Sequence, residues 1–246
     1  MFDLTVLPIK PPKKRNTLKR PVDERLPDID AGAMVLLVAC IKSGKSTLIS
    51  NLLLSPHFYK ESFDNVYIIS PSIHNDVTSR HLLHEFEDTV FERYDDSIIK
   101  NIIKYQSTFT PEKRPRFALI CDDIMGEIGK NDAINNFATR FRHFGCKLLL
   151  FSVQAFKGLP PVIRANCTDA FIGCPMPNLG ELDKIADEYS ALYEGKENFL
   201  RLYHEACNER YKFMYLRLHH RPTECWRSFD ERIYVGTDFQ GVSKAD

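Results

Sequence analysis

An apolar run that ends in a short polar loop constrains this chain more than any other stretch of its 246 residues. Residues 35–41 are apolar, residues 42–47 read Lys-Ser-Gly-Lys-Ser-Thr, and leucine or isoleucine then recurs at helical spacing at positions 48, 49, 52 and 53. Strand, loop and helix in this order are the context for a phosphate-binding loop, because the N–H groups of the loop and the positive end of the helix converge on one anion. The sequence therefore predicts such a loop at residues 39–47.

The residue types in the loop give it a specific chemistry. Lys45 is expected to reach the β- and γ-phosphates of a nucleotide, and the Ser46 hydroxyl is expected to ligate Mg²⁺. Ala39 stands where the full motif has glycine, which alanine can replace if its φ is negative. The residues expected to contact the nucleotide are Ala39, Ser43, Gly44, Lys45, Ser46 and Thr47. Until a second element is found, a strand that turns into a helix with an incidental lysine remains an alternative.

A second apolar stretch leads directly into two carboxylates. Residues 116–123 read Arg-Phe-Ala-Leu-Ile-Cys-Asp-Asp, and a strand that is apolar on both faces is typical of a buried parallel sheet. Ligands bind at the carboxyl ends of such strands. We expect Asp122 to hold Mg²⁺ through water and Asp123 to orient or deprotonate the attacking water. A solvated Asp-Asp turn is the alternative.

A third apolar strand, at residues 146–154, ends in a polar side chain, Gln154. If this strand lies between the loop strand and the aspartate strand, Gln154 faces the γ-phosphate and can sense hydrolysis. A glutamine that simply ends a strand in solvent is the alternative. Further strands are expected at residues 65–70, 89–91 and 168–173, with an edge strand at 211–218. Helices are expected around Ile98–Ile103, from Asn131 through Phe141, at 179–189 and at 197–207.

Composition bounds the remaining interpretation. With 43% hydrophobic residues, 27% charged residues and a formal net charge of +0, the chain suits one globular domain, and any electrostatic case for nucleic acid must be local. Residues 1–30 carry five prolines, and their basic residues include Lys10, Lys13, Lys14, Arg15, Lys19 and Arg20. This stretch reads as an extended arm that contacts phosphates, serves nuclear targeting, or is a solvated tail. Residues 221–246 are expected to be an irregular tail anchored by Trp226.

The seven cysteines are expected to be buried, reduced thiols of an intracellular protein. The group Cys207, His219, His220 and Cys225 lacks zinc-ligand spacing. No apolar run is long enough to cross a bilayer, so no membrane span is expected.

The order of these parts resembles the FtsK/HerA superfamily of DNA-translocating ATPases, and within it the genome-packaging ATPases of poxviruses, other large DNA viruses and virophages. The resemblance covers residues 33–218 and rests on the phosphate-binding loop, on Asp122 and Asp123, on the Arg-His-x-Gly of residues 142–145 leading to Gln154, and on residues 163–166. One departure is Asp123, where the wider superfamily commonly has glutamate.

The resemblance implies an α/β fold: a P-loop NTPase three-layer sandwich with a mostly parallel central sheet of the RecA/ASCE type. The glutamine strand would lie between the Walker A and Walker B strands. It implies a P-loop ATPase domain at residues 31–220 between the arm and the tail. Arg142, with Arg140 as a substitute, would be inserted into the site of a neighbouring subunit.

The function implied is an ATP-hydrolysing motor that packages viral double-stranded DNA into capsids. ATP and Mg²⁺ would be the cofactors, and the partners would be DNA, capsid or portal components, and further copies in a ring, a hexamer or a pentamer. The expected location is the host cytoplasm at a virus factory, or the virion, with nuclear entry through the basic arm. A nucleotide or small-molecule kinase and a nucleotide-gated assembly protein without turnover are the alternatives that the residues leave open.

Overall fold

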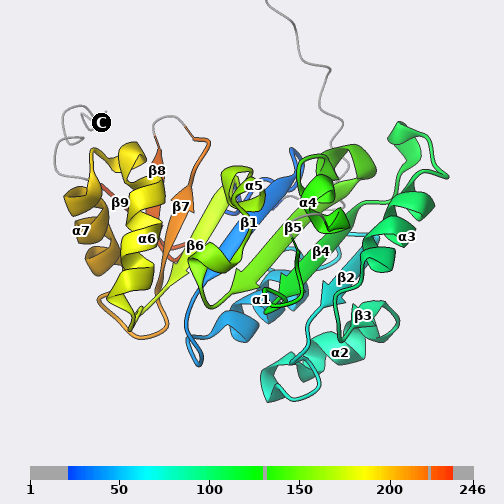
Figure 1. Ribbon diagram of the computed structural model, residues 1–246, viewed down its shortest axis with the longest axis horizontal. Coiled ribbons are helices and arrows are strands. Elements are labelled where there is room, and N and C mark those ends of the chain that lie inside the picture. Colours follow the sequence, from blue (N-terminus) through cyan, green and yellow to red (C-terminus); the bar gives the residue numbers. More distant parts are fainter. Residues whose placement is uncertain (1–21, 130–131, 221–222, 235–246) are drawn as a thin grey trace, which may run out of the picture.

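The computed structural model describes residues 22–129, 132–220 and 223–234, and they form a three-layer α/β sandwich around one nine-stranded sheet (Figure 1). The strand order is β3-β2-β4-β5-β1-β6-β7-β8-β9. The first six strands in this order are parallel and the last three are antiparallel. The strands are β1 (Ala33–Val38), β2 (Asn65–Ile69), β3 (Val90–Phe91), β4 (Phe117–Asp122), β5 (Cys146–Val153), β6 (Asp169–Gly173), β7 (Phe213–Arg217), β8 (Glu224–Arg227) and β9 (Glu231–Ile233).

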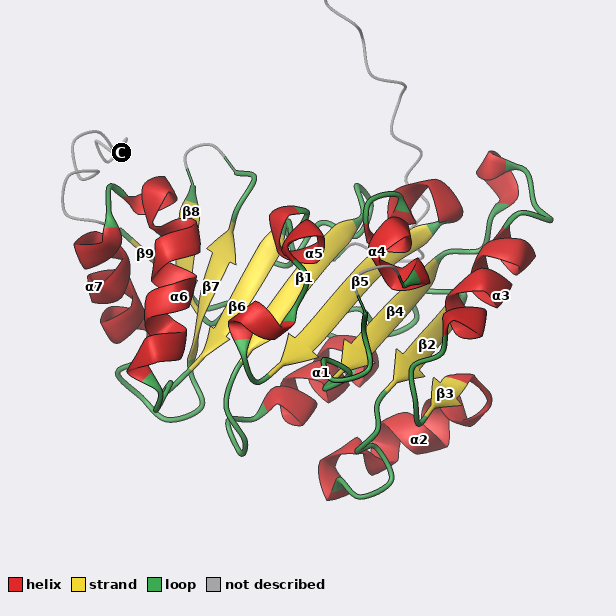
Figure 2. Cartoon of the chain, in the orientation of Figure 1, coloured by secondary structure: helices red, strands yellow, loops and turns green. Residues whose placement is uncertain are grey.

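Helices cover both faces of the sheet (Figure 2). One face packs against α1 (Lys45–Leu54) and α2 (Arg80–Phe86). The other face packs against α3 (Asp96–Gln106), α4 (Ala133–Ala138), α5 (Pro161–Ala165), α6 (Leu179–Tyr189) and α7 (Lys196–Ala206).

The side chains of β1 point alternately to the two faces of the sheet, so its apolar run packs against helices on both sides. Val35 and Leu37 point toward the α1 face, whereas Leu36 and Val38 join the core on the opposite face. All six residues of the strand are buried, as a parallel sheet with helices on both sides requires. The three-layer sandwich expected from the sequence is confirmed.

The glutamine strand occupies the position predicted for it. β5 lies between β4 and β1, with Asp122 opposite Ser152 and Val38 opposite Val153. The carboxyl ends of the three strands therefore meet at one edge of the sheet. This arrangement brings the phosphate-binding loop, the two aspartates and Gln154 together.

The carboxyl-terminal part differs from the prediction. β7 is not an edge strand, because it pairs with β8, and β8 pairs with β9. The turn between β8 and β9 places Phe229 against Phe58, Phe171, Phe213 and Tyr215, with ring centroids 5.2 to 5.6 Å apart. The segment expected to be irregular therefore extends the sheet, and Trp226 lies within β8.

Three smaller expectations also need correction. Residues 22–30 are not a free arm, since Leu26 and Ile29 are buried and Tyr59 donates a hydrogen bond to the Pro27 carbonyl. The helix expected to run to Phe141 is α4, which ends at Ala138; a 3₁₀ turn, Phe141–Phe144, follows it. The cap predicted at Asn131, the basic residues of 1–21 and the end of the predicted tail lie outside the described residues.

The cysteines are only partly as expected. Cys174 and Cys207 form a disulfide, whereas Cys40, Cys121, Cys146, Cys167 and Cys225 are free thiols. The disulfide joins the end of β6 to the end of α7, two places that no sequence pattern brings together. Among the residues that the structure describes, no helix has the length and apolar character needed to cross a membrane.

Candidate functional site

A cleft of about 1070 Å³ opens at the edge where the parallel strands end. It is lined by the phosphate-binding loop, by residues at the carboxyl ends of β4 and β5, by the segment after β2, and by residues 211–213 at the start of β7. Of the predicted site residues, this cleft brings together Ala39, Ser43, Gly44, Lys45, Ser46, Thr47, Asp122, Asp123 and Gln154.

The phosphate-binding loop has the backbone shape that its sequence predicts. Gly44 has a φ of 93° and forms the N-cap of α1, a left-handed conformation that glycine adopts without strain. The Ser43 hydroxyl donates to the Cys40 carbonyl oxygen at 2.6 Å. These features close the loop around the first turn of α1, where unpaired N–H groups can bind an anion.

Lys45 lies along the loop. Its Nζ donates to the carbonyl oxygens of Ala39 at 2.9 Å and Cys40 at 3.2 Å. Neither partner is a carboxylate, so the charge of the ammonium group is available to an anion bound in the loop.

Ala39 is accommodated by a second glycine. The Ala39 N–H continues the ladder to the Val153 carbonyl oxygen at 3.0 Å, and its methyl group packs against Gly173 at the end of β6. A Cβ on Gly173 would lie 2.3 Å from the Cβ of Ala39. The side chain missing at position 173 therefore leaves the space that the methyl group of Ala39 occupies.

Asp122 is a partly buried carboxylate at the end of β4, near Ser46 of α1. The Ser70 hydroxyl, just after β2, donates to its Oδ2 at 3.0 Å. Burial raises the pKa of the Asp122 carboxyl, against the opposing effect of the Ser152 and Ser70 hydroxyls. Asp76 lies on the same side of the cleft. Burial disfavours its ionised form, but hydrogen bonds from Ser46 and from the 3₁₀ turn after Asp76 outweigh that effect and lower its pKa.

Asp123 and Gln154 form a hydrogen-bonded pair at the mouth of the cleft. Asp123 has a φ of 52°, and its N–H donates to the Ser152 carbonyl oxygen at 2.9 Å. The Gln154 Nε2 donates to Oδ2 of Asp123 at 3.0 Å. The left-handed turn directs Asp123 away from the strand direction, and the amide of Gln154 holds its carboxylate in place.

The donor set suits Mg²⁺. The candidate ligands Ser46 and Asp122 offer a hydroxyl and a carboxylate oxygen, the hard donors that Mg²⁺ binds together with water and phosphate oxygens. Among the described residues, no group of three or more His, Cys, Asp or Glu side chains could hold a metal ion. Softer, nitrogen- or sulfur-rich metal sites are therefore not found in this part of the chain.

Arg142 lies outside the cleft, at the opposite edge of the sheet. Its Nε donates to the Gly32 carbonyl oxygen at 3.0 Å, just before β1 begins. The six residues of β1 separate this point from the loop, a distance of ~20 Å at the rise of a β-strand. Arg142 and Arg140 are both exposed. Arg142 cannot act on the site of its own subunit from this position.

Ser70, Asp76 and Tyr211 are among the residues that line or support the cleft and that the sequence interpretation missed. Ser70 carries the signal used for the other strands, a polar residue at the carboxyl end of an apolar strand. The position of Asp76 at the cleft depends on the path of the loop after β2, which the sequence pattern does not show. Tyr211 reaches the cleft because β7 is antiparallel and therefore begins at the edge where the parallel strands end, and no local pattern marks this.

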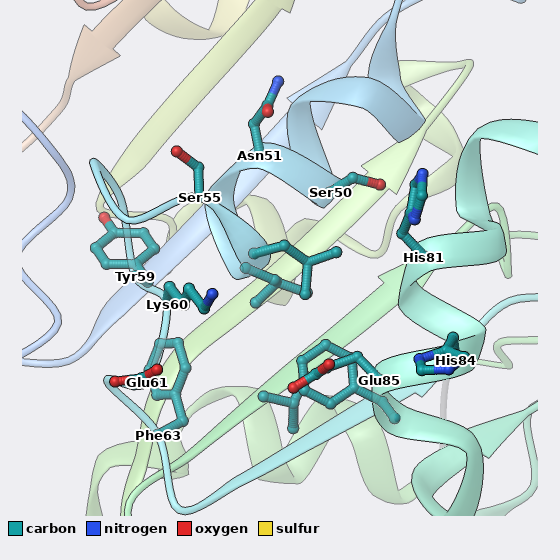
Figure 3. Close-up of a pocket in the computed structure, with 14 residues that line it drawn as sticks. Ser50, Asn51, Ser55, Tyr59, Lys60, Glu61, Phe63, His81, His84 and Glu85 are labelled. Atoms are coloured by element: carbon teal, nitrogen blue, oxygen red, sulfur yellow. The ribbon is translucent and has the colours of Figure 1, made fainter.

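A second cleft, of about 580 Å³, opens between the second half of α1 and α2 (Figure 3). His81, His84 and Glu85 of α2 lie on one side of it, and Lys60 and Glu61 lie on the other. It contains neither the phosphate-binding loop nor the aspartates that follow β4. Both histidines are exposed.

Solved structures of viral packaging proteins share this architecture. The genome packaging NTPase B204 from Sulfolobus turreted icosahedral virus 2, in complex with ATP-gammaS, is 21% identical, with a TM-score of 0.55 over 80% of this chain and 98% of that one. The DNA-packaging ATPase B204 from Sulfolobus turreted icosahedral virus is 18% identical, with a TM-score of 0.54 over 78% and 96% of the two chains. This chain has the fold of a viral genome-packaging NTPase. The resemblance expected from the sequence is thus confirmed at the level of the fold.

The structure of B204 from Sulfolobus turreted icosahedral virus 2 in complex with AMP has the same fold. It is 20% identical to this chain, with a TM-score of 0.55 over 79% of this chain and 96% of that one. No protein-family model matches the chain, and no curated protein sequence matches it.

Proposed function

We propose that this chain is an ATP-hydrolysing, DNA-translocating motor that packages viral double-stranded DNA. The observation that carries the proposal is the convergence of the phosphate-binding loop, Asp122, Asp123 and Gln154 in one cleft. The likeness to packaging NTPases supports it, because that fold is matched over nearly the whole of their chains.

The triphosphate of ATP binds in the loop in this proposal. The N–H groups of residues 43–47 donate to the β-phosphate, Lys45 exchanges its two carbonyl partners for phosphate oxygens, and Gly44 allows the close backbone approach. Ser46 and Asp122 hold Mg²⁺, which when bound neutralises phosphate charge.

The pair formed by Asp123 and Gln154 acts on the attacking water. Asp123 accepts a hydrogen bond from water and orients it toward the γ-phosphate, while the amide of Gln154 fixes the carboxylate. Loss of the γ-phosphate changes the contacts of Gln154, and the chain leads from Gln154 through the 3₁₀ turn Phe156–Gly158 to Arg164 in α5. Glu188 of α6 pairs with Arg164 at 2.9 Å, so this segment is tied to the helical layer.

Arg142 serves the site of a neighbouring subunit in a homo-oligomeric ring, a hexamer or a pentamer. Its place at the edge opposite the cleft supports this role, because head-to-tail contacts bring opposite surfaces of successive subunits together. Double-stranded DNA, capsid or portal components and a host-cytoplasmic or virion location complete the proposal. The domain limits 1–30, 31–220 and 221–246, and nuclear entry through the basic arm, stay predictions.

The deciding experiment is steady-state ATP hydrolysis across protein concentration, with and without double-stranded DNA. The rate per subunit should rise with both. Lys45→Ala should remove activity, whereas the control Lys104→Ala, on exposed α3 surface, should leave it unchanged. Hydrolysis that depends on a phosphate acceptor instead of DNA would favour a kinase. Nucleotide binding without turnover would favour an assembly protein.

A further inference from the structure

Tyr211 stands on the wall of the cleft opposite the strand-terminal aspartates. It is 56% exposed, and its backbone is left-handed, with a φ of 67°. Its Cδ1 lies 3.7 Å from the position that a Cβ would take on Gly44. The ring therefore lies against the phosphate-binding loop without being buried by the rest of the chain.

Neighbouring contacts hold the ring at this place. The Arg210 guanidinium lies 4.7 Å from the ring centroid, and Lys212 pairs with Asp230 at 3.3 Å, which ties the segment to the turn between β8 and β9. A left-handed backbone at a tyrosine costs on the order of 1 kcal/mol, and burial of the exposed ring contributes little in return.

The first turns of α1 also line the cleft. Thr47, Leu48 and Asn51 face the cleft together with Tyr211. A triphosphate held in the loop directs its nucleoside along one flank of the loop, and this flank offers an exposed aromatic face, an apolar side chain and an amide. Such a set suits a flat heteroaromatic base, with stacking on the ring and hydrogen bonding to the base edge.

We propose that Tyr211 is the stacking platform for the base of the bound nucleotide, with Leu48 and Asn51 completing the base site. This inference rests on the proposed function, because it requires the phosphates to bind in the loop. The strength of stacking on an aromatic ring depends more on the size of a base than on its hydrogen-bonding groups. Purine nucleotides therefore bind more tightly than pyrimidine nucleotides.

The test compares a ligand that has a base with one that lacks it. Binding of a non-hydrolysable ATP analogue and of inorganic tripolyphosphate, each with Mg²⁺, is measured by calorimetry for the unmodified chain, Tyr211→Asn and Tyr211→Phe. Asparagine tolerates the left-handed backbone and removes the ring. Tyr211→Asn should weaken the ATP analogue about tenfold or more and leave tripolyphosphate unchanged, while Tyr211→Phe should stay within about twofold of the unmodified chain, because the ring is retained.

A control and a second readout make the outcome decisive. Tyr105→Ala, another exposed tyrosine at 45% on α3, should change neither affinity. In Tyr211→Trp, the ATP analogue should quench the added fluorescence and tripolyphosphate should not. Equal binding of the ATP analogue by Tyr211→Asn and the unmodified chain would overturn the base site alone. Failure of the unmodified chain to bind either ligand would overturn the proposed function as well.

Discussion

Asp122 illustrates how a single residue balances stability against function. Its carboxylate lies partly buried beside Ser70, and this burial raises its pKa above the ordinary value of 3.8. The folded state therefore holds the proton more tightly than the unfolded state. The stabilising contribution is complete below the unfolded pKa and is lost as the pH rises from about 4 through the raised folded pKa.

Asp122→Asn should accordingly raise the free energy of unfolding at neutral pH in the absence of nucleotide, since no buried charge remains. The gain should vanish near pH 4, where the native carboxyl is protonated. Every tenfold difference in proton affinity between the folded and unfolded states corresponds to about 1.4 kcal/mol. Urea unfolding of both chains between pH 4 and 8 measures it. A gain in the free energy of unfolding that is the same at every pH would show that the charge of Asp122 is not its cause.

The contact between Ala39 and Gly173 gives a second prediction for single residues. Gly173→Ala should lower the free energy of unfolding by about 1–3 kcal/mol, because the new Cβ forces the loop and β6 apart. Nucleotide affinity should fall with it. The double variant with Ala39→Gly should recover most of both losses. Thermal unfolding and nucleotide titration measure them, with Gly126→Ala, which has open space around its Cα, as the control.

At the scale of elements, the turn between β8 and β9 stabilises the antiparallel half of the sheet through Phe229. Phe229→Ala should lower the free energy of unfolding by about 3 kcal/mol, because four aromatic neighbours lose a partner. Urea unfolding measures it. Tyr105→Ala, whose ring meets Phe109 at 5.2 Å near the surface, should cost much less. Equal losses in the two variants would show that the turn does not support the core.

Some of these elements could be predicted from the sequence and others could not. The parallel strands were predictable because burial on both faces leaves apolar runs, and polar residues at their ends revealed Asp122, Asp123 and Gln154. β8 and β9 were not, because their half-buried strands mix charged and apolar residues without clear alternation. The disulfide and the position of Tyr211 were beyond prediction too, since both depend on how the antiparallel strands return to the cleft.

At the scale of the whole molecule, the cleft and Arg142 lie at opposite edges of the sheet. A ring whose sites form between neighbours should therefore show complementation between defective subunits. Asp123→Ala and Arg142→Ala should each abolish ATP hydrolysis. An equal mixture should recover about a quarter of the normal rate, since half of the sites keep Asp123 and half of their neighbours keep Arg142. Steady-state hydrolysis after mixing measures it.

Two controls complete this experiment. Arg142 also packs against Gly32, so the thermal stability of Arg142→Ala must be compared with that of the unmodified chain. A mixture of Asp123→Ala with Lys45→Ala should stay inactive, because both lesions lie in the same site. Recovery in that mixture, or none in the first, would argue against an arginine supplied by a neighbour.

The contact between Ala39 and Gly173 also sets the order in which substitutions at these two positions are tolerated. While alanine occupies position 39, position 173 admits glycine alone, because any Cβ there meets the Ala39 methyl group at 2.3 Å. A substitution to glycine at position 39 would free position 173 to vary afterwards. The reverse order passes through a strained intermediate. Substitution at position 39 is thus coupled to substitution at a residue 134 positions (173 − 39) further along the chain. Changes at the two positions have a preferred order.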